Sequence, residues 1–295
     1  MKNERIIVIL AFFAIYIIWG SSYLFNKILV NECPPFELAG FRFLIAGIII
    51  FIFAKVRRMD LTITKRQLKN SIFAGFLFLT MGNGILVWGL QYLDTGFTAL
   101  LIAAQPLNIL ILLWIWKGQK IKGKSIIGVI LGLVGIYLLM QGQEIGSNFS
   151  WTGVGLVFVS MMCWGIASIY VTDADLPKNQ FINSAYQMVI SGVTMLILSP
   201  LFGEEWVNPL AISTWGYISW AFLIIFASII AFSSFNYLLK KVSPEKVATS
   251  AYVNPVVAVF LGYIVLGEEL GVMTLIASGI LLVGVYFVNS AKGEG

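Results

Sequence analysis

The sequence predicts an all-α integral membrane protein with ten transmembrane helices that form two inverted five-helix repeats. Three observations predict this fold class: the composition, a series of long apolar runs, and a match of the chain to itself. Hydrophobic residues make up 59% of the 295 residues and charged residues 11%, and the mean hydropathy is +0.91. Soluble domains carry roughly 25% charged residues, so this chain has too few charges to cover a soluble globule.

The apolar runs have the length of membrane-spanning helices. About 20 apolar residues cross the hydrocarbon core of a bilayer, and runs of that order recur along the whole chain. They predict spans at residues 6–30, 36–54, 71–93, 97–116, 125–141, 152–172, 180–202, 213–239, 247–266 and 272–289. The first run is longer than the core of a signal peptide and no small-residue cleavage motif follows it, so we expect it to be retained as the first helix.

The second half of the chain repeats the first. Residues 88–139 match residues 237–288 at a constant offset of 149, and the residues before them match at an offset of 145. The matched pairs include Trp19 with Trp164, Gly47 with Gly192, Ala99 with Ala248, Pro106 with Pro255, and Gly135 with Gly284. A self-match at fixed spacing indicates a repeated structural unit. The sequence therefore predicts one five-helix unit at residues 1–146 and a second at residues 147–295.

The charged residues predict the orientation of the chain. All but two of the 19 Lys and Arg residues, Lys27 and Arg42, fall in loops on one side of a ten-span chain. Acidic residues mark the other side, at Glu32, Asp94, Glu144, Glu204, Glu205, Glu268 and Glu269. Cytoplasmic loops carry an excess of basic residues, so both termini are expected in the cytoplasm, with the helices in the cell (inner) membrane. Each unit has five helices, an odd number, so the chain enters the second unit from the opposite side of the membrane. Inverted repeats are a recurrent plan of secondary transporters.

Short motifs in both halves suggest a family. They are Trp19-Gly20-Ser21-Ser22-Tyr23, Phe41-Arg42-Phe43-Leu44, the Gln91-Tyr92-Leu93 turn before Pro106, and Asn254-Pro255-Val256-Val257 followed by Gly267-Glu268. In these motifs the chain resembles the EamA family of the drug/metabolite transporter superfamily, over nearly its whole length. The resemblance implies a ten-helix transporter of a kind that typically exports amino acids or other small metabolites. Gln119 and Asn254 stand where the family often has glutamate, so no carboxylate role is carried over to them.

Two proline sites are the first candidates for a substrate pathway. Pro106 and Pro255 each lack a backbone N–H and leave a carbonyl four residues earlier without its helical partner, at Ile102 and Ala251. An amide precedes each proline, Gln105 in one half and Asn254 in the other. We interpret these pairs as two kinks beside a wet central cavity. The alternative is an ordinary tolerated kink with the amide bonded to the local backbone.

Further polar and aromatic residues inside the spans complete the candidate pathway. They are Trp19, Ser22, Arg42, Asn83, Trp88, Asn108, Trp164, Gln187 and Tyr252. Polar groups at membrane depth usually face the bundle interior or a cavity, and hydrogen bonding or packing between helices is the alternative for each. For Arg42 one hypothesis is attraction of a substrate carboxylate. The sequence favours the other, an arginine that reaches outward to the surface or pairs with Glu37.

The residues that are absent limit the chemistry. The chain has no histidine, and no Asp or Glu falls in the central part of any predicted span. We find no catalytic triad, metal site or cofactor motif. Residues 118–125 match the spelling of a phosphate-binding loop, but a membrane helix precedes them where that loop needs a buried strand. The sequence therefore predicts a non-enzyme without cofactor or metal, and the basic loops do not indicate nucleic-acid binding.

We predict a secondary transporter of small organic metabolites that works by alternating access, and specifically an exporter of amino acids or related compounds. The alternatives are a broad exporter of lipophilic or cationic compounds, an integral membrane enzyme acting on lipid intermediates, and a membrane scaffold. The expected partners are a small-molecule substrate and the lipid bilayer. Gly128 and Gly132 form a G-x-x-x-G pair that predicts close helix packing and, as a weaker possibility, a homodimer.

Overall fold

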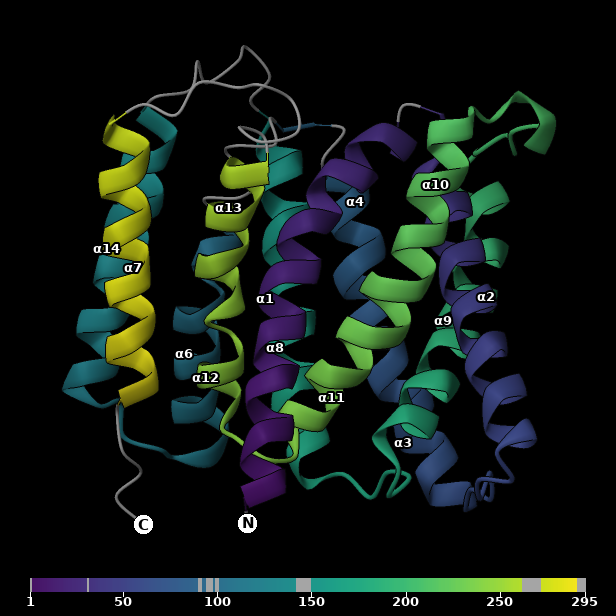
Figure 1. The fold of residues 1–295 in the computed structure, drawn as a ribbon, viewed down its shortest axis with the longest axis horizontal. Helices are drawn as coiled ribbons and strands as arrows, with labels where there is room; N and C mark the ends of the chain where they lie inside the picture. Colours follow the sequence, from purple (N-terminus) through teal and green to yellow (C-terminus); the bar gives the residue numbers. More distant parts are fainter. Residues whose placement is uncertain are drawn as a thin grey trace.

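The structure is a computed structural model, and it describes residues 2–30, 32–89, 92–93, 98, 101–141, 150–261 and 272–290. Every regular element in these ranges is helical, as the composition predicts, and the helices stand side by side as a bundle (Figure 1). Seven of the acidic, repeat and motif residues named above lie outside the described residues: Gln91, Asp94, Ala99, Glu144, Gly267, Glu268 and Glu269.

Helices cover most of the described part of each predicted span. The first half contains α1 (Lys2–Val30), α2 (Pro35–Val56), α3 (Lys65–Gly75), η1 (Phe76–Gly84), α4 (Ile85–Gly89), α6 (Gln105–Lys117) and α7 (Gly123–Gln141). The second half contains α8 (Trp151–Asp173), α9 (Gln180–Leu201), η2 (Pro209–Ala211), α10 (Thr214–Phe222), η3 (Leu223–Phe232), α11 (Ser233–Leu239), α12 (Pro244–Val247), α13 (Ser250–Leu261) and α14 (Val272–Ser290). Elements η1 and η3 are π-helical and join their neighbours into continuous rods, Lys65–Gly89 and Thr214–Leu239.

By length and hydropathy, six helical segments of the described chain can cross a membrane. They are Glu4–Val30, Pro35–Val56, Lys65–Gly89, Trp151–Asp173, Gln180–Leu201 and Thr214–Leu239. Two shorter apolar helices, Gly123–Leu138 and Leu275–Val288, pack against each other as parts of α7 and α14. The apolar runs in the sequence therefore correspond to helices, and several of these are long enough to span a bilayer.

Two predicted boundaries are wrong, each for a local reason. The span expected at residues 71–93 begins at Lys65, because Thr64 and Gln67 form a capping box that starts the helix within the basic segment. The helix expected at residues 97–116 is interrupted at Ala104. Pro106 therefore lies in the first turn of α6, where a missing N–H costs little, whereas Pro255 lies inside α13.

Glycines allow the closest helix contacts in the bundle. A Cβ atom added at Gly192 of α9 would lie 2.5 Å from the Leu44 backbone nitrogen of α2. One added at Gly128 of α7 would lie 2.7 Å from the Gly284 carbonyl oxygen of α14, and one at Gly132 would lie 2.3 Å from the Tyr252 ring. The G-x-x-x-G pair of α7 thus packs against helices of its own chain.

The N-terminus of α2 is capped by a residue from the other half. Pro34 offers no side-chain cap, and the Glu204 carboxylate accepts hydrogen bonds from the Phe36 and Glu37 backbone nitrogens, both at 3.0 Å. The Ser199 hydroxyl donates to the same carboxylate at 2.7 Å. A negative charge at this position also complements the helix dipole.

Replacing Glu204 with alanine should therefore destabilise the protein by about 1–2 kcal/mol, the usual cost of losing a helix cap. The measurement is the thermal unfolding midpoint of the purified protein in detergent. Glu205→Ala is the matched control, because Glu205 is the next residue and its side chain is exposed. Equal midpoints for the two variants would show that the cap contributes nothing.

Candidate functional site

A cavity of about 220 Å³ lies between helices of the two halves. Elements α1, α2, η1, α4, α6, α8, η3, α11, α12 and α13 contribute to its wall. Its polar lining residues are Ser22, Asn26, Arg42, Asn83, Gln105, Ser160, Ser168, Ser250 and Asn254. No described residue of the wall is acidic. At roughly 30 Å³ per water molecule, the cavity has room for a small organic molecule.

The structure brings seven of the predicted pathway residues together in this wall. They are Trp19, Ser22, Arg42, Asn83, Gln105, Trp164 and Asn254. Ile102 and Ala251, whose carbonyls the two prolines leave without a helical N–H, also line the cavity. Pro106 and Pro255 themselves are not lining residues. The proline-containing helices of both halves thus meet the same cavity.

The amide side chains of the wall differ in their hydrogen bonding. Gln105 Nε2 donates to the Met161 carbonyl of α8 at 3.3 Å, and Asn108 Nδ2 donates to the same carbonyl at 2.8 Å. The Oδ1 atoms of Asn83 and Asn254 are buried and have no hydrogen-bond partner among the described residues. Leaving a buried acceptor unpaired is costly. These two oxygens are therefore available to a hydrogen-bond donor that enters the site.

Arg42 is a buried cation, with 6% of its surface exposed. Its Nε donates to the Ser228 hydroxyl of η3 at 2.8 Å, and its guanidinium carbon lies 4.8 Å from the centre of the Phe43 ring. Among the described residues no carboxylate lies within 4.0 Å of the guanidinium. Glu37 instead accepts a hydrogen bond from the Val207 backbone nitrogen at 3.1 Å. The preferred sequence interpretation, pairing with Glu37 or reaching the surface, is wrong because Arg42 points into the bundle.

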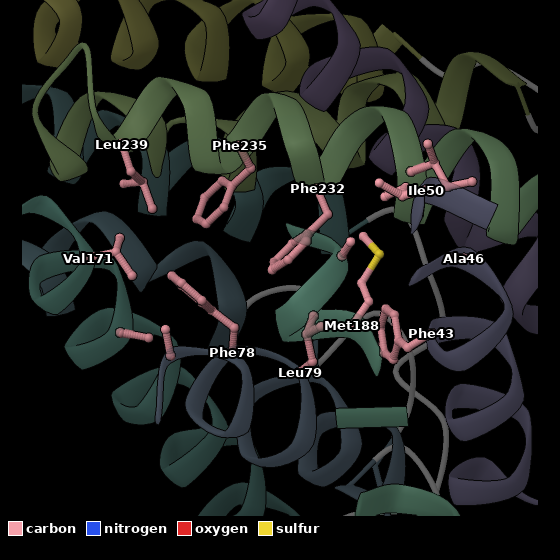
Figure 2. Close-up of a cluster of buried hydrophobic side chains, with 14 of the residues drawn as sticks. Phe43, Ala46, Ile50, Phe78, Leu79, Val171, Met188, Phe232, Phe235 and Leu239 are labelled. Atoms are coloured by element: carbon pink, nitrogen blue, oxygen red, sulfur yellow. The ribbon is translucent and has the colours of Figure 1, made fainter. Parts of the chain in front are cut away.

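Aromatic rings form the apolar side of the cavity. Trp19 and Trp164 meet edge to face with ring centroids 5.9 Å apart, and Phe235 lies 5.2 Å from one and 5.4 Å from the other. The Trp19 indole nitrogen donates to the Ala227 carbonyl at 3.2 Å, which fixes its ring. Figure 2 shows Phe78, Phe232 and Phe235 pointing toward one another from η1, η3 and α11. The wall therefore suits a molecule with an apolar part.

The remaining candidates lie outside the wall and have other partners. Trp88 packs on Phe202, with ring centroids 5.0 Å apart. Gln187 belongs to a buried amide cluster, in which Asn236 Nδ2 donates to Gln187 Oε1 at 3.1 Å. Tyr252 is fully buried against α7, and Asn108 bonds across to α8 as described. The rotation of their helices turns these residues toward neighbouring helices.

Sequence reasoning missed several lining residues. Asn26, Ser160, Ser168 and Ser250 line the cavity, and Ser228 holds Arg42. For Asn26 a signal existed, because it lies four residues after Ser22 and therefore on the same helix face. The serines give no comparable signal, since small hydroxyl residues are common within membrane helices.

Comparisons with known proteins agree with the fold. The sequence model described as the EamA-like transporter family matches twice, at residues 6–141 and 151–290. The chain is 35% identical over 283 residues to the uncharacterized inner membrane transporter YedA of Escherichia coli strain K12, covering 96% of this chain and 90% of YedA. It is 23% identical to the uncharacterized transporter YoaV of Bacillus subtilis, with 95% of each chain covered.

A solved crystal structure has the same fold. It superposes with a TM-score of 0.79 at 17% sequence identity, over 96% of both chains. The two matches of the family model, and the alignment to an inner membrane transporter, each cover nearly the whole sequence. The protein is thus an integral membrane protein of the transporter class, and its chain belongs to the EamA-like transporter family that its motifs resemble.

Proposed function

We propose that the protein is a secondary transporter that carries small organic metabolites, amino acids or related compounds, outward through the central cavity by alternating access. The observation that carries this proposal is the cavity itself, which helices of both halves line with aromatic rings, amides and one guanidinium. Sites between two repeats, near the middle of the membrane, are the usual binding sites of secondary transporters.

The two halves support an inverted ten-helix arrangement. In Figure 1 the rod of α3, η1 and α4 and the rod of α10, η3 and α11 run in opposite directions. Packing is paired in the same way: α1 contacts α13 and η3, while α8 contacts α6 and η1. Helix α1 begins and helix α14 ends at the same end of the bundle (Figure 1). Each of these features is expected if the second five-helix unit is an inverted copy of the first.

The topology has a direct test. Reporter fusions after Lys69, Lys124 and Lys178 should report the cytoplasm, and a fusion near Glu204 should report the exterior, because cytoplasmic loops carry the basic residues. An active periplasmic reporter at Lys124 would contradict the ten-span arrangement.

Binding and transport test the proposed function. The purified protein is incubated with a panel of amino acids and related metabolites, and ligands are detected by a rise in the thermal unfolding midpoint. Compounds that bind are then loaded into proteoliposomes, and their protein-dependent efflux is measured. The proposal requires at least one compound that both stabilises the protein and moves across the membrane.

Of the alternatives, a carrier for cationic compounds is disfavoured, because the described wall holds an arginine and no acid.

A further inference from the structure

The cavity contains a positive charge that no protein group balances. Arg42 is the one Lys or Arg among the described lining residues, and none of these residues is acidic. The nearest acid on the same helix, Glu37, is already bonded to the Val207 nitrogen. A buried charge without a partner destabilises a protein, and the penalty is relieved when an opposite charge binds.

The guanidinium is held so that one edge stays free. The Ser228 hydroxyl accepts from Nε, and the Phe43 ring lies beside the guanidinium carbon. Among the described residues neither Nη group has a hydrogen-bond acceptor, and Arg42 lines the cavity. Two parallel Nη–H groups match the two oxygens of a carboxylate. The fixed Nε contact therefore leaves a two-pronged donor beside the cavity.

We propose that Arg42 determines the specificity of the site by binding the carboxylate of the carried molecule, so that the protein selects small organic carboxylates and rejects their neutral or cationic analogues. This proposal rests on the proposed transport function. A single carboxylate balances the single charge of Arg42, whereas a doubly charged phosphate ester would bring a second, unbalanced charge into the cavity. The aromatic rings of Trp19, Trp164 and Phe235 accommodate the apolar remainder of the ligand.

Three compounds with one carbon skeleton, and a phosphate ester that carries the same phenyl ring, test this role. The purified protein in nanodiscs is titrated with 3-phenylpropanoate, 3-phenylpropanamide, 3-phenylpropylamine and phenyl phosphate. We expect the carboxylate to bind at least about tenfold more tightly than each of the others, and Arg42→Gln to weaken its binding on the order of 100-fold. Arg57→Gln is the control, because it removes an exposed basic residue from the end of the same helix. The proposal would be overturned if the carboxylate and the amide bound with equal affinity, or if Arg42→Gln bound the carboxylate as tightly as the parent. Tighter binding of phenyl phosphate than of the carboxylate would assign the site to phosphate esters instead.

A second measurement separates this proposal from the proposed function. Iodide and neutral acrylamide both quench tryptophan fluorescence, and Trp19 and Trp164 line the cavity with Arg42. The chain has nine tryptophans, and those outside the cavity contribute equally to every variant, so the variants are compared with one another. We expect the ratio of iodide quenching to acrylamide quenching to be the same in the parent and in Arg42→Lys, which keeps the charge, and to be lower in Arg42→Gln. If no compound binds but the ratio behaves in this way, the anion site stands and the proposed substrates are wrong. If Arg42→Gln keeps the parental ratio, Arg42 is only a structural link between α2 and η3.

Discussion

Gly192→Leu should yield a protein that is poorly folded and recovered in low amount. A side chain at this position would meet backbone atoms of α2. Its Cβ atom would already lie 2.5 Å from the Leu44 backbone nitrogen and 2.8 Å from the Gly40 carbonyl oxygen. Backbone atoms cannot move aside as a flexible side chain can, so α2 and α9 would have to separate along their interface. Overpacking commonly costs about 1–3 kcal/mol, and we expect a loss at or above the upper end of this range.

The measurement is size-exclusion chromatography of the detergent-solubilised protein, followed by its thermal unfolding midpoint. Gly155→Leu is the matched control, because a Cβ atom added at Gly155 of α8 meets no atom within 4 Å. The control should elute as a single species with the parental midpoint. A single sharp peak and a parental midpoint for Gly192→Leu would show that the two helices are not held at this distance.

Pro106→Ala and Pro255→Ala should each give well-expressed protein with strongly reduced transport. Alanine restores a backbone N–H and favours a regular helix, so folding should be spared. The restored N–H can bond the carbonyl of Ile102 or Ala251, both of which line the cavity. Pro255→Ala thus straightens α13, whereas Pro106→Ala adds a donor in the first turn of α6, next to the break at Ala104. We expect each change to lower transport by about tenfold or more, as misplaced binding groups commonly cause.

Efflux from proteoliposomes at equal protein content measures this effect. Pro200→Ala is the control, because Pro200 lies in the last turn of α9 and is exposed, away from the cavity. Gln105→Leu and Asn254→Leu should also reduce efflux, since they remove the amides next to each proline. Parental rates for all four variants would mean that the prolines and amides serve packing alone.

The sequence predicted the features that depend on composition and spacing. Apolar length located the helices, and the motifs around Arg42 and Asn254 identified the family that the comparisons confirm. The placement of Trp19 beside Trp164 also follows the repeat, since matched positions of two related units can meet at their interface. The start of α3 was predicted late because Lys65, Arg66 and Lys69 look like loop residues, although a helix can carry them once Thr64 caps it.

Helix rotation limited the prediction of the site. Gln187 and Arg42 are matched positions of the repeat, and only the packed structure shows that Gln187 joins an amide cluster while Arg42 lines the cavity. Tyr252 and Asn254 lie two residues apart on α13 and therefore face different neighbours: Tyr252 packs on Gly132, and Asn254 lines the cavity. The direction of a single side chain depends on the contacts of the whole helix, which apolar length does not specify.

The π-helical segments change how the two long rods should be scanned by mutagenesis. In a π-helix the hydrogen bonds join residues five apart, where an α-helix joins residues four apart. Ala227 and Phe232 of η3 accordingly line the same cavity although five positions separate them. A helical wheel drawn at 3.6 residues per turn through this rod would place Phe232 well away from Ala227. The α segments on either side of η1 and η3 therefore need separate wheels, with a phase step between them.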